Sequence, residues 1–277
     1  MNSQHLPVFA SEITQLIKSK SPVNILDLTF GRGGYSKISL DEHTENKVFA
    51  FDLDPEAIAY SKEKFKDQRF KIFQANFKNF YTCIKNDLSN TDQILILADL
   101  GISSPQIDQP HRGMSYRFKD ELLDLRFDPN LGEPAWKILK TLRIEVLEEI
   151  LRDYGELKGS RRLANALKLA SQGQVTTGQV FNICKDPSLT SRVFQAIRIY
   201  LNDELESLDQ LLFEINSLKW ENLSMAFVSF HSLEDRIVKR RAKEYGWKEI
   251  NFFKSVSDVE FKINPRSRSA KLRIYEK

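Results

Sequence analysis

Strand-like and helix-like segments alternate between residues 23 and 101. Pro55 opens one helix-like stretch, P-E-A-I-A-Y-S-K-E-K-F, and a proline fits well in the first turn of a helix. The unbroken apolar run of residues 94–98 is typical of a strand that is buried on both faces. Strand–helix–strand units at this spacing form right-handed crossovers, so the sequence predicts an α/β fold with a parallel sheet. The four predicted strands span residues 23–30, 47–52, 70–75 and 93–99.

This alternation stops after the fourth predicted strand. No segment from about residue 105 to residue 219 is convincingly strand-like. Strand-like segments then return near the C-terminus, at 223–230, 251–256 and 271–276. We therefore expect a discontinuous α/β domain of residues 1–107 and 200–277, interrupted by a helical domain of residues 108–199. Helices are predicted at 141–155, at 159–172, after a cap at Thr176 or Thr177, and at 188–218.

The last of these helices is the longest. Its apolar residues recur every three or four positions, which predicts a single helix with one buried stripe. The stripe consists of Val193, Ile197, Leu201, Leu205, Leu208, Leu212 and Ile215.

Charge is unevenly distributed along the chain. Residues 231–277 contain 13 Lys and Arg against 7 Asp and Glu, whereas the whole chain has a formal net charge of only +3. A basic C-terminal segment on a near-neutral body indicates a localised anionic partner. The alternative is a solvated, lysine-rich surface.

Several classes of protein are disfavoured by the composition. No apolar stretch approaches the ~20 residues that a membrane span requires, and the N-terminus lacks the pattern of a signal peptide. Cys83 and Cys184 are isolated in the sequence, so no disulfide framework is expected. These features predict a cytoplasmic protein without a metal site. The histidines, which show no ligand spacing, are His5, His43, His111 and His231.

Two features near the ends of the first strands predict a nucleotide-like ligand. A glycine-rich turn, G-R-G-G, follows the first strand, and Asp52 ends the second strand 21 residues after Gly31. An acid at this place typically accepts hydrogen bonds from ribose hydroxyls. Neither G-x-G-x-x-G nor the P-loop lysine is present, so the usual sequence signal for a pyrophosphate is missing.

S-adenosylmethionine fits this pattern. Asp52 would accept from its ribose, and Phe77, just past the third strand, would flank its adenine. Asp99 ends the fourth strand, where it would accept from the ammonium group or lie beside the methyl group that is transferred. The alternative for Asp99 is a cap on the turn that follows it.

Eleven stretches of the chain, which together span nearly its whole length, carry a resemblance to a known family. They are H-L-P-V (5–8), D-L-T-F-G-R-G-G-Y-S (27–36), D-L-D-P-E-A (52–57), A-D-L-G-I-S-S-P-Q-I-D (98–108), R-G-M-S-Y (112–116), L-D-L-R-F (123–127), Y-G-E (154–156), R-V-F-Q-A-I-R-I (192–199), N-D-E-L (202–205), S-F-H-S-L-E-D-R-I-V-K (229–239) and N-P-R-S-R-S-A-K-L-R (264–273). In these stretches and their order, the chain resembles the bacterial 16S ribosomal RNA cytosine-N4 methyltransferases, the RsmH or MraW family. The strings S-F-H-S-L-E-D-R and N-P-R-S-R-S are unusual, which makes the resemblance specific.

The resemblance implies a class I S-adenosylmethionine methyltransferase sheet (Rossmann-like) with a helical insertion after the fourth strand that recognises the substrate. The substrate that it implies is a cytidine in the decoding centre of the small ribosomal subunit, within an assembled or nearly assembled particle. Tyr35 stands where the family usually has histidine, and the segment from Arg236 to Asn264 is shorter than in typical members. The implied cofactor contacts are Gly33, Gly34, Tyr35, Asp52, Phe77, Asp99 and Gln106.

Catalytic roles follow from the same motifs. The place after the fourth strand reads D-L-G-I, without the proline and aromatic residue of many amino-methyltransferases. Asp99 is the best-placed acceptor for the amine, with Ser103 and Ser104 next. His231 would contact the substrate or relay a proton, and its alternative is a structural hydrogen bond. The candidates for contacts with RNA phosphates are Arg112, Arg266 and Arg268, for which surface salt bridges are the alternative.

Two other functions compete with this interpretation. One is a class I methyltransferase with a small-molecule or protein substrate, which the basic C-terminal segment disfavours. The other is a cofactor-binding ribosome-assembly module with weak or lost catalysis, which the tyrosine at position 35 and the shortened segment keep open. The oligomeric state and the group that accepts the amine proton are not determined by the sequence.

Overall fold

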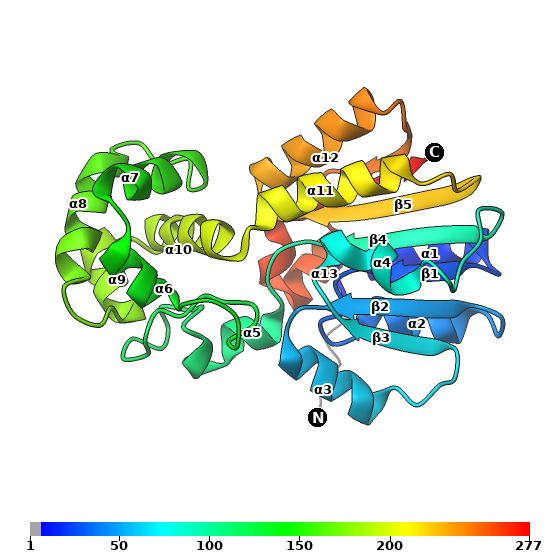
Figure 1. The fold of residues 1–277 in the computed structure, drawn as a ribbon, viewed down its shortest axis with the longest axis horizontal. Coiled ribbons are helices and arrows are strands. Elements are labelled where there is room, and N and C mark those ends of the chain that lie inside the picture. Colours follow the sequence, from blue (N-terminus) through cyan, green and yellow to red (C-terminus); the bar gives the residue numbers. More distant parts are fainter. Residues whose placement is uncertain (1–6) are drawn as a thin grey trace. The chain divides into compact units, whose positions relative to one another are not determined.

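The computed structural model describes residues 7–277, so His5 and Leu6 of the H-L-P-V stretch lie outside the described residues. The chain forms two compact units (Figure 1). One contains the described residues up to Gly101 together with Leu205–Lys277, and the other is Ile102–Glu204. Within residues 7–277, no helix has the length and apolar character needed to cross a membrane.

The first unit is built on a seven-stranded sheet with the strand order β3-β2-β1-β4-β5-β7-β6. Neighbouring strands from β3 to β5 pair in parallel, whereas β7 is antiparallel to both β5 and β6. All seven predicted strands are present. Their bounds are β1 Asn24–Asp27, β2 Lys47–Asp52, β3 Phe70–Gln74, β4 Gln93–Asp99, β5 Asn222–Ser229, β6 Lys248–Phe253 and β7 Lys271–Glu276.

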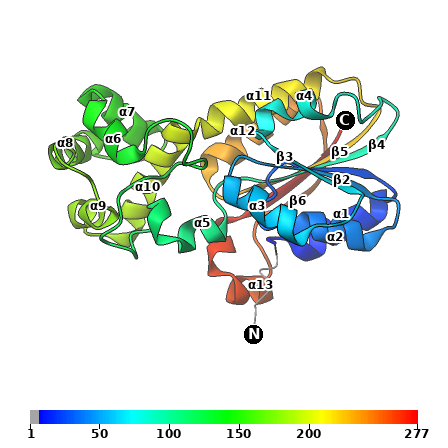
Figure 2. The same ribbon diagram turned by 60° about the horizontal axis from the view of Figure 1, so that its bottom comes forward.

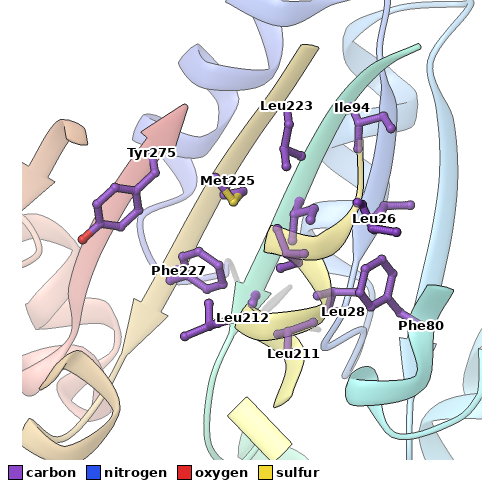
Figure 3. Packing of buried hydrophobic residues seen from close by; sticks show 14 of the residues in the cluster. Leu26, Leu28, Phe80, Ile94, Leu211, Leu212, Leu223, Met225, Phe227 and Tyr275 are labelled. Atoms are coloured by element: carbon purple, nitrogen blue, oxygen red, sulfur yellow. The ribbon is translucent and has the colours of Figure 1, made fainter. Parts of the chain in front are cut away.

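Helices cover both faces of this sheet (Figure 2). Side chains alternate along β4, so that Ile94 and Ile96 pack into one apolar cluster and Leu95 and Leu97 into the other. Figure 3 shows the first of these clusters, where Leu211 and Leu212 of a helix meet the sheet. This double burial explains why the fourth strand is an uninterrupted apolar run. One face carries α1 Ala10–Lys20, α2 Gly34–Glu42 and α3 Pro55–Lys64, and the other carries α4 Phe80–Ile84, α11 Glu204–Ser217 and α12 Ser232–Glu244.

The second unit is helical, with an apolar core of its own. Its β-structure, within the residues described, is a single bridge between Leu122 and Thr176. Thr176 also caps α9, since its hydroxyl accepts from the backbone N–H of Gln179, 3.2 Å away. The helices are α5 Ser104–Asp108, α6 Ala135–Thr141, α7 Ile144–Asp153, α8 Ser160–Ala170, α9 Thr177–Cys184 and α10 Pro187–Asn202. The 3₁₀ helix η2, Pro110–Arg112, lies between α5 and α6.

The prediction of one long helix over residues 188–218 was wrong. Asp203 adopts a left-handed backbone conformation with φ 57°, which ends α10 before α11 begins. The apolar stripe is therefore divided between two cores: Val193 lies in the helical core, whereas Leu208 lies in a core of the sheet unit. The apolar spacing on either side of the break happens to continue in phase, so periodicity alone did not reveal the break.

Candidate active site

Three aspartates lie at one edge of the sheet because each ends a parallel strand. Asp27 ends β1, Asp52 ends β2 and Asp99 ends β4. Since β1 pairs in parallel with both β2 and β4, the three carboxylates lie at neighbouring strand ends. Asp27 was not among the predicted site residues. Its position as the last residue of a strand, like that of Asp52 and Asp99, is the signal that would have identified it.

Asp52 fixes the glycine-rich turn. Its Oδ2 accepts a hydrogen bond from the backbone N–H of Gly31 at 2.7 Å, and its Oδ1 accepts from that of Asp54 at 2.9 Å. Burial raises the pKa of Asp52 to about 6, and these two hydrogen bonds oppose that shift. Each carboxylate oxygen retains a further lone pair, so Asp52 can still accept hydrogen bonds from ribose hydroxyls.

Gly33 and Gly34 lie where a larger residue would not fit. Gly33 precedes α2 with φ +72°, and a Cβ atom there would come within 2.4 Å of the Phe65 ring. A Cβ atom on Gly34 would come within 2.9 Å of Pro7. Glycine at these two positions therefore lets Phe65 and Pro7 pack closely against the turn after β1.

Asp27 and Asp99 each carry a buried oxygen that lacks a partner. The Oδ1 atoms of both residues are buried and accept no hydrogen bond from any residue between 7 and 277. Asp27 Oδ2 accepts from the Ser36 hydroxyl at 2.6 Å, and the backbone N–H of Asp99 donates to Thr29 Oγ1 at 2.7 Å. Unpartnered buried acceptors are unusual and call for a donor that is not part of the chain.

The electrostatics of this pair favour a cationic ligand. Burial, together with the smaller effect of the nearby negative charges of Asp27, Glu234 and Glu260, raises the pKa of Asp99 to about 8. Burial likewise raises the pKa of Asp27 to about 6, although hydrogen bonds from the Ser36 hydroxyl and from the backbone of Thr29 and Ser36 oppose the shift. A positive group against both carboxylates would reverse these shifts and stabilise the charged forms. The ammonium and sulfonium groups of S-adenosylmethionine have this character, so the residues present fit that cofactor.

Two of the predicted cofactor contacts, Tyr35 and Phe77, pack against other parts of the sheet unit. Tyr35 is buried in α2, and its hydroxyl donates to the backbone carbonyl of Val8. Burial and the surrounding carboxylates raise the pKa of Tyr35 well above its usual value, so it stays protonated and keeps this bond. Phe77 begins the 3₁₀ helix η1, Phe77–Asn79, and is partly buried against the core beneath α11. The contact of Phe77 with adenine stays a prediction, whereas the Tyr35 side chain joins α2 to the backbone of Val8.

His231 occupies a structural position. It is the N-cap of α12, and its Nδ1 accepts from the backbone N–H of Glu234 at 3.4 Å. Glu234 Oε2 accepts in return from the backbone N–H groups of Phe230 at 2.8 Å and His231 at 3.3 Å. This reciprocal arrangement is a capping box, and it supports the alternative of a structural histidine. Glu234, which contributes to the raised pKa of Asp99, was not predicted from the sequence.

The predicted residues of the helical unit also have local partners. Gln106 is buried, and its Oε1 accepts from the backbone N–H of Ser103 at 3.0 Å at the start of α5. Arg112 does not suit the predicted phosphate contact, because its side chain is buried and its Nη2 donates to the backbone carbonyls of Arg126 and Phe127. Within residues 7–277, no three His, Cys, Asp or Glu side chains are arranged to hold a metal ion.

Arg266 and Arg268, by contrast, are exposed on the 3₁₀ helix η3, Pro265–Ser269. Lys271 follows at the start of β7, where it pairs with Ser229 at the end of β5. Since β5 ends at the edge that carries Asp99, η3 lies at that same edge. The two arginines therefore lie on the side of the sheet unit that carries the candidate active site.

Comparison with known proteins shows which family the chain belongs to. The model of the MraW methylase family matches residues 2–277. The chain belongs to the MraW methylase family. The resemblance inferred from the sequence motifs is thereby confirmed, and with it the class I methyltransferase fold.

Curated members of the family align over essentially the whole chain. A ribosomal RNA small subunit methyltransferase H of Mycoplasmopsis synoviae is 37% identical over 305 residues, covering 100% of this chain and 99% of that protein. A protein of the same name from Acinetobacter baylyi is 35% identical over 303 residues, covering 99% of each. Family membership identifies the chain as a methyltransferase.

Proposed function

We propose that this chain transfers the methyl group of S-adenosylmethionine to the N4 amine of a decoding-centre cytidine in 16S ribosomal RNA. The observation that carries the proposal is the pair of buried Oδ1 atoms of Asp27 and Asp99, which have no partner among the described residues. They lie beside Asp52 and the glycine turn. Membership in a methylase family and relatives named as small-subunit ribosomal RNA methyltransferases support the same function.

The cofactor would be held at four points. Asp52 would accept from the ribose hydroxyls, and Phe77 would flank the adenine. Asp27 and Asp99 would accept from the ammonium group, and the backbone at Gly33 allows the ligand to approach closely. When bound, the cofactor supplies a methyl group that is already activated by the positive sulfur.

The protein then has to position a weak nucleophile. The N4 lone pair is delocalised into the cytosine ring, so alignment with the methyl carbon and acceptance of a hydrogen bond are the main contributions left to the protein. The N–C bond forms as the C–S bond breaks, its electron pair goes to sulfur, and the amine loses one proton. Asp99 is our candidate acceptor for that proton, with Ser103 as the alternative. His231 would contribute by fixing the start of α12.

Basic side chains on the sheet unit support an RNA substrate. Arg266 and Arg268 are exposed at the edge that carries Asp99. The exposed side of α12 adds a row of cations at helical spacing, consisting of Arg236, Lys239, Arg240 and Lys243. We further propose that the helical unit assists recognition, that the substrate is an assembled or nearly assembled small subunit, and that the enzyme acts in the cytoplasm.

The decisive test is methyl transfer from labelled S-adenosylmethionine to purified small subunits that lack the modification, followed by base-resolved mass spectrometry. We expect one methyl group on N4 of a single cytidine, and Asp99→Asn should lower the single-turnover rate more than it lowers cofactor affinity. Equal losses would make Asp99 only a cofactor contact. Binding to particles without methyl transfer would favour the assembly-module alternative, and a methylated small molecule or protein would replace the RNA substrate.

A further inference from the structure

The connection between β6 and β7 lies beside the candidate active site. Strand β6 ends with Phe253 paired to Leu272, and Lys271 pairs with Ser229 at the end of β5. The residues between β6 and β7, which include α13 Asp258–Ile263, therefore lie at the edge that carries Asp99 (Figure 1). The negative charge of Glu260 in α13 contributes to the raised pKa of Asp99, which is consistent with this placement.

Helix α13 is fixed on its inner side. Glu260 Oε1 accepts a hydrogen bond from the backbone N–H of Phe9 at 2.8 Å, which joins α13 to the start of α1. Ser257 caps the helix, since its hydroxyl accepts from the backbone N–H of Glu260 at 3.2 Å. These two hydrogen bonds fix the position of α13, and with it the position of the residues on its solvent-facing side.

That outer side is apolar. Val259 is 69% exposed and Ile263 is 68% exposed, and their separation by four residues places them on the same side of one turn. Single exposed apolar side chains are normal at a protein surface, and Leu169 and Phe213 are examples in this chain, but Val259 and Ile263 form a pair at the edge that carries Asp99. Three exposed cations, Lys262, Arg266 and Arg268, follow closely in α13 and η3, against one exposed acid, Asp258, at the start of α13.

Apolar and basic groups in this combination suit a nucleic acid strand. A cytidine in a folded RNA must leave its stack before its N4 amine can reach Asp99, and unstacking costs a few kcal/mol. Proteins that unstack bases commonly insert aliphatic side chains into the gap, while arginine and lysine hold the phosphates. An apolar protein partner would not account for three exposed cations beside the pair, whereas the phosphates of an RNA strand do.

We propose that Val259 and Ile263 form an apolar wedge that packs against the bases flanking the target cytidine and occupies the place it leaves in the stack. Arg266 and Arg268 hold the adjacent phosphates. This inference rests on the proposed function, because it requires an RNA substrate. It assigns to α13 the task of keeping the target base out of its stack, separately from the methyl transfer itself.

The test compares two substrates. One is the small subunit with its natural RNA, and the other is a subunit reconstituted with RNA in which the nucleotide next to the target cytidine is abasic, so that the target is already unstacked. We expect Val259→Ser with Ile263→Ser to lower the single-turnover rate at least tenfold on the natural particle and less than threefold on the abasic one. Cofactor affinity should be unchanged. The conservative pair Val259→Leu with Ile263→Leu should restore the rate on the natural particle.

A matched control is Phe213→Ser in α11, which removes another side chain that is 61% exposed from the same unit. It should leave both rates unchanged. Equal losses on both substrates, or no loss on either, would overturn the wedge. Weaker binding of the double variant to particles with normal methylation of protein-free RNA would also overturn it, by assigning the pair to a ribosomal protein. If the wild-type chain methylates neither particle, the proposed function itself fails.

Discussion

Binding of S-adenosylmethionine should release about one proton near neutral pH. Asp99 has a pKa of about 8 in the cofactor-free chain because it is buried among other carboxylates, so it is mostly protonated at about pH 7. A cationic ammonium group against the Asp99 carboxylate favours its ionised form. Binding must therefore drive off the proton that Asp99 carries.

The size of the effect follows from the fraction of Asp99 that is ionised. With a pKa of about 8, roughly 1% of the carboxyl is ionised at about pH 6 and roughly half at about pH 8. Cofactor affinity should therefore rise roughly 50-fold over that range, or about 2 kcal/mol. Asp27, with a pKa of about 6, adds a factor of about two. Above about pH 8 the amine of the ligand loses its own proton, so the rise should stop there.

Isothermal titration calorimetry in two buffers of different ionisation enthalpy counts these protons. At about pH 7 the wild-type chain should release close to one proton for each cofactor bound. Asp99→Asn has no carboxyl to ionise, so it should release about a tenth of a proton and bind weakly at every pH. A wild-type chain that releases no proton, or an Asp99→Asn variant that keeps the full pH dependence, would refute the assignment of Asp99 to the ammonium group.

Two further predictions concern stability, measured by urea unfolding. Gly33→Ala should lower the free energy of unfolding by about 2–4 kcal/mol, from left-handed strain and the overlap with the Phe65 ring, whereas Gly246→Ala, with φ +72° but no atom within 4 Å, should cost only about 1–2 kcal/mol. Similar losses in both would contradict the role given to the overlap. Glu204→Gln leaves the buried Arg198 guanidinium, now 2.7 Å from Glu204 Oε1, without its counter-charge, and should cost about 3 kcal/mol. Arg152→Gln, which breaks an exposed pair, should cost less than about 0.5 kcal/mol, and equal effects would refute this difference.

The strands could be predicted because their signals are local. Three predicted segments, 47–52, 93–99 and 271–276, coincide with β2, β4 and β7. Each is a short apolar or alternating run between polar turns, and burial against helices accounts for that composition. The start of α3 could also be predicted from neighbouring residues. Pro55 is the first residue of the helix, and the side chain of Asp54 before it accepts from the backbone N–H of Glu56.

The break between α10 and α11 could not be predicted because it depends on tertiary partners. Asp203 is a residue that tolerates the left-handed conformation, but nothing in the local sequence requires it there. The Asn202 side chain accepts from the backbone N–H of Phe127 and donates to the carbonyl of Leu125, and Arg198 pairs with Glu204 across the break. These partners are up to 77 residues away in the sequence, beyond the range of any periodicity.

Site residues could be predicted where the residue type and its place at a strand end indicate a role. They could not be predicted where the role depends on whether the side chain is buried. Asp52 and Asp99 were found because each is the last residue of a predicted strand, where an acid typically contacts a nucleotide-like ligand. Arg112 was predicted to contact phosphate because arginine usually lies at the surface, yet it is buried and donates to two backbone carbonyls. Asp27 was missed because the first strand was predicted to continue to residue 30, which placed Asp27 inside the strand, whereas β1 ends at Asp27.

The same carboxylates that favour the cofactor oppose folding in its absence. Asp27, Asp52 and Asp99 all have a pKa raised by burial, so between about pH 4 and pH 8 the native chain binds more protons than the unfolded chain. The free energy of unfolding of the cofactor-free chain therefore falls as the pH rises through this range. A cation bound at these strand ends restores that stability, because it binds only the native chain and compensates the charges that burial disfavours. Because the carboxylates lie at the ends of the strands, they lower the free energy of unfolding without interrupting the apolar cores on either face of the sheet.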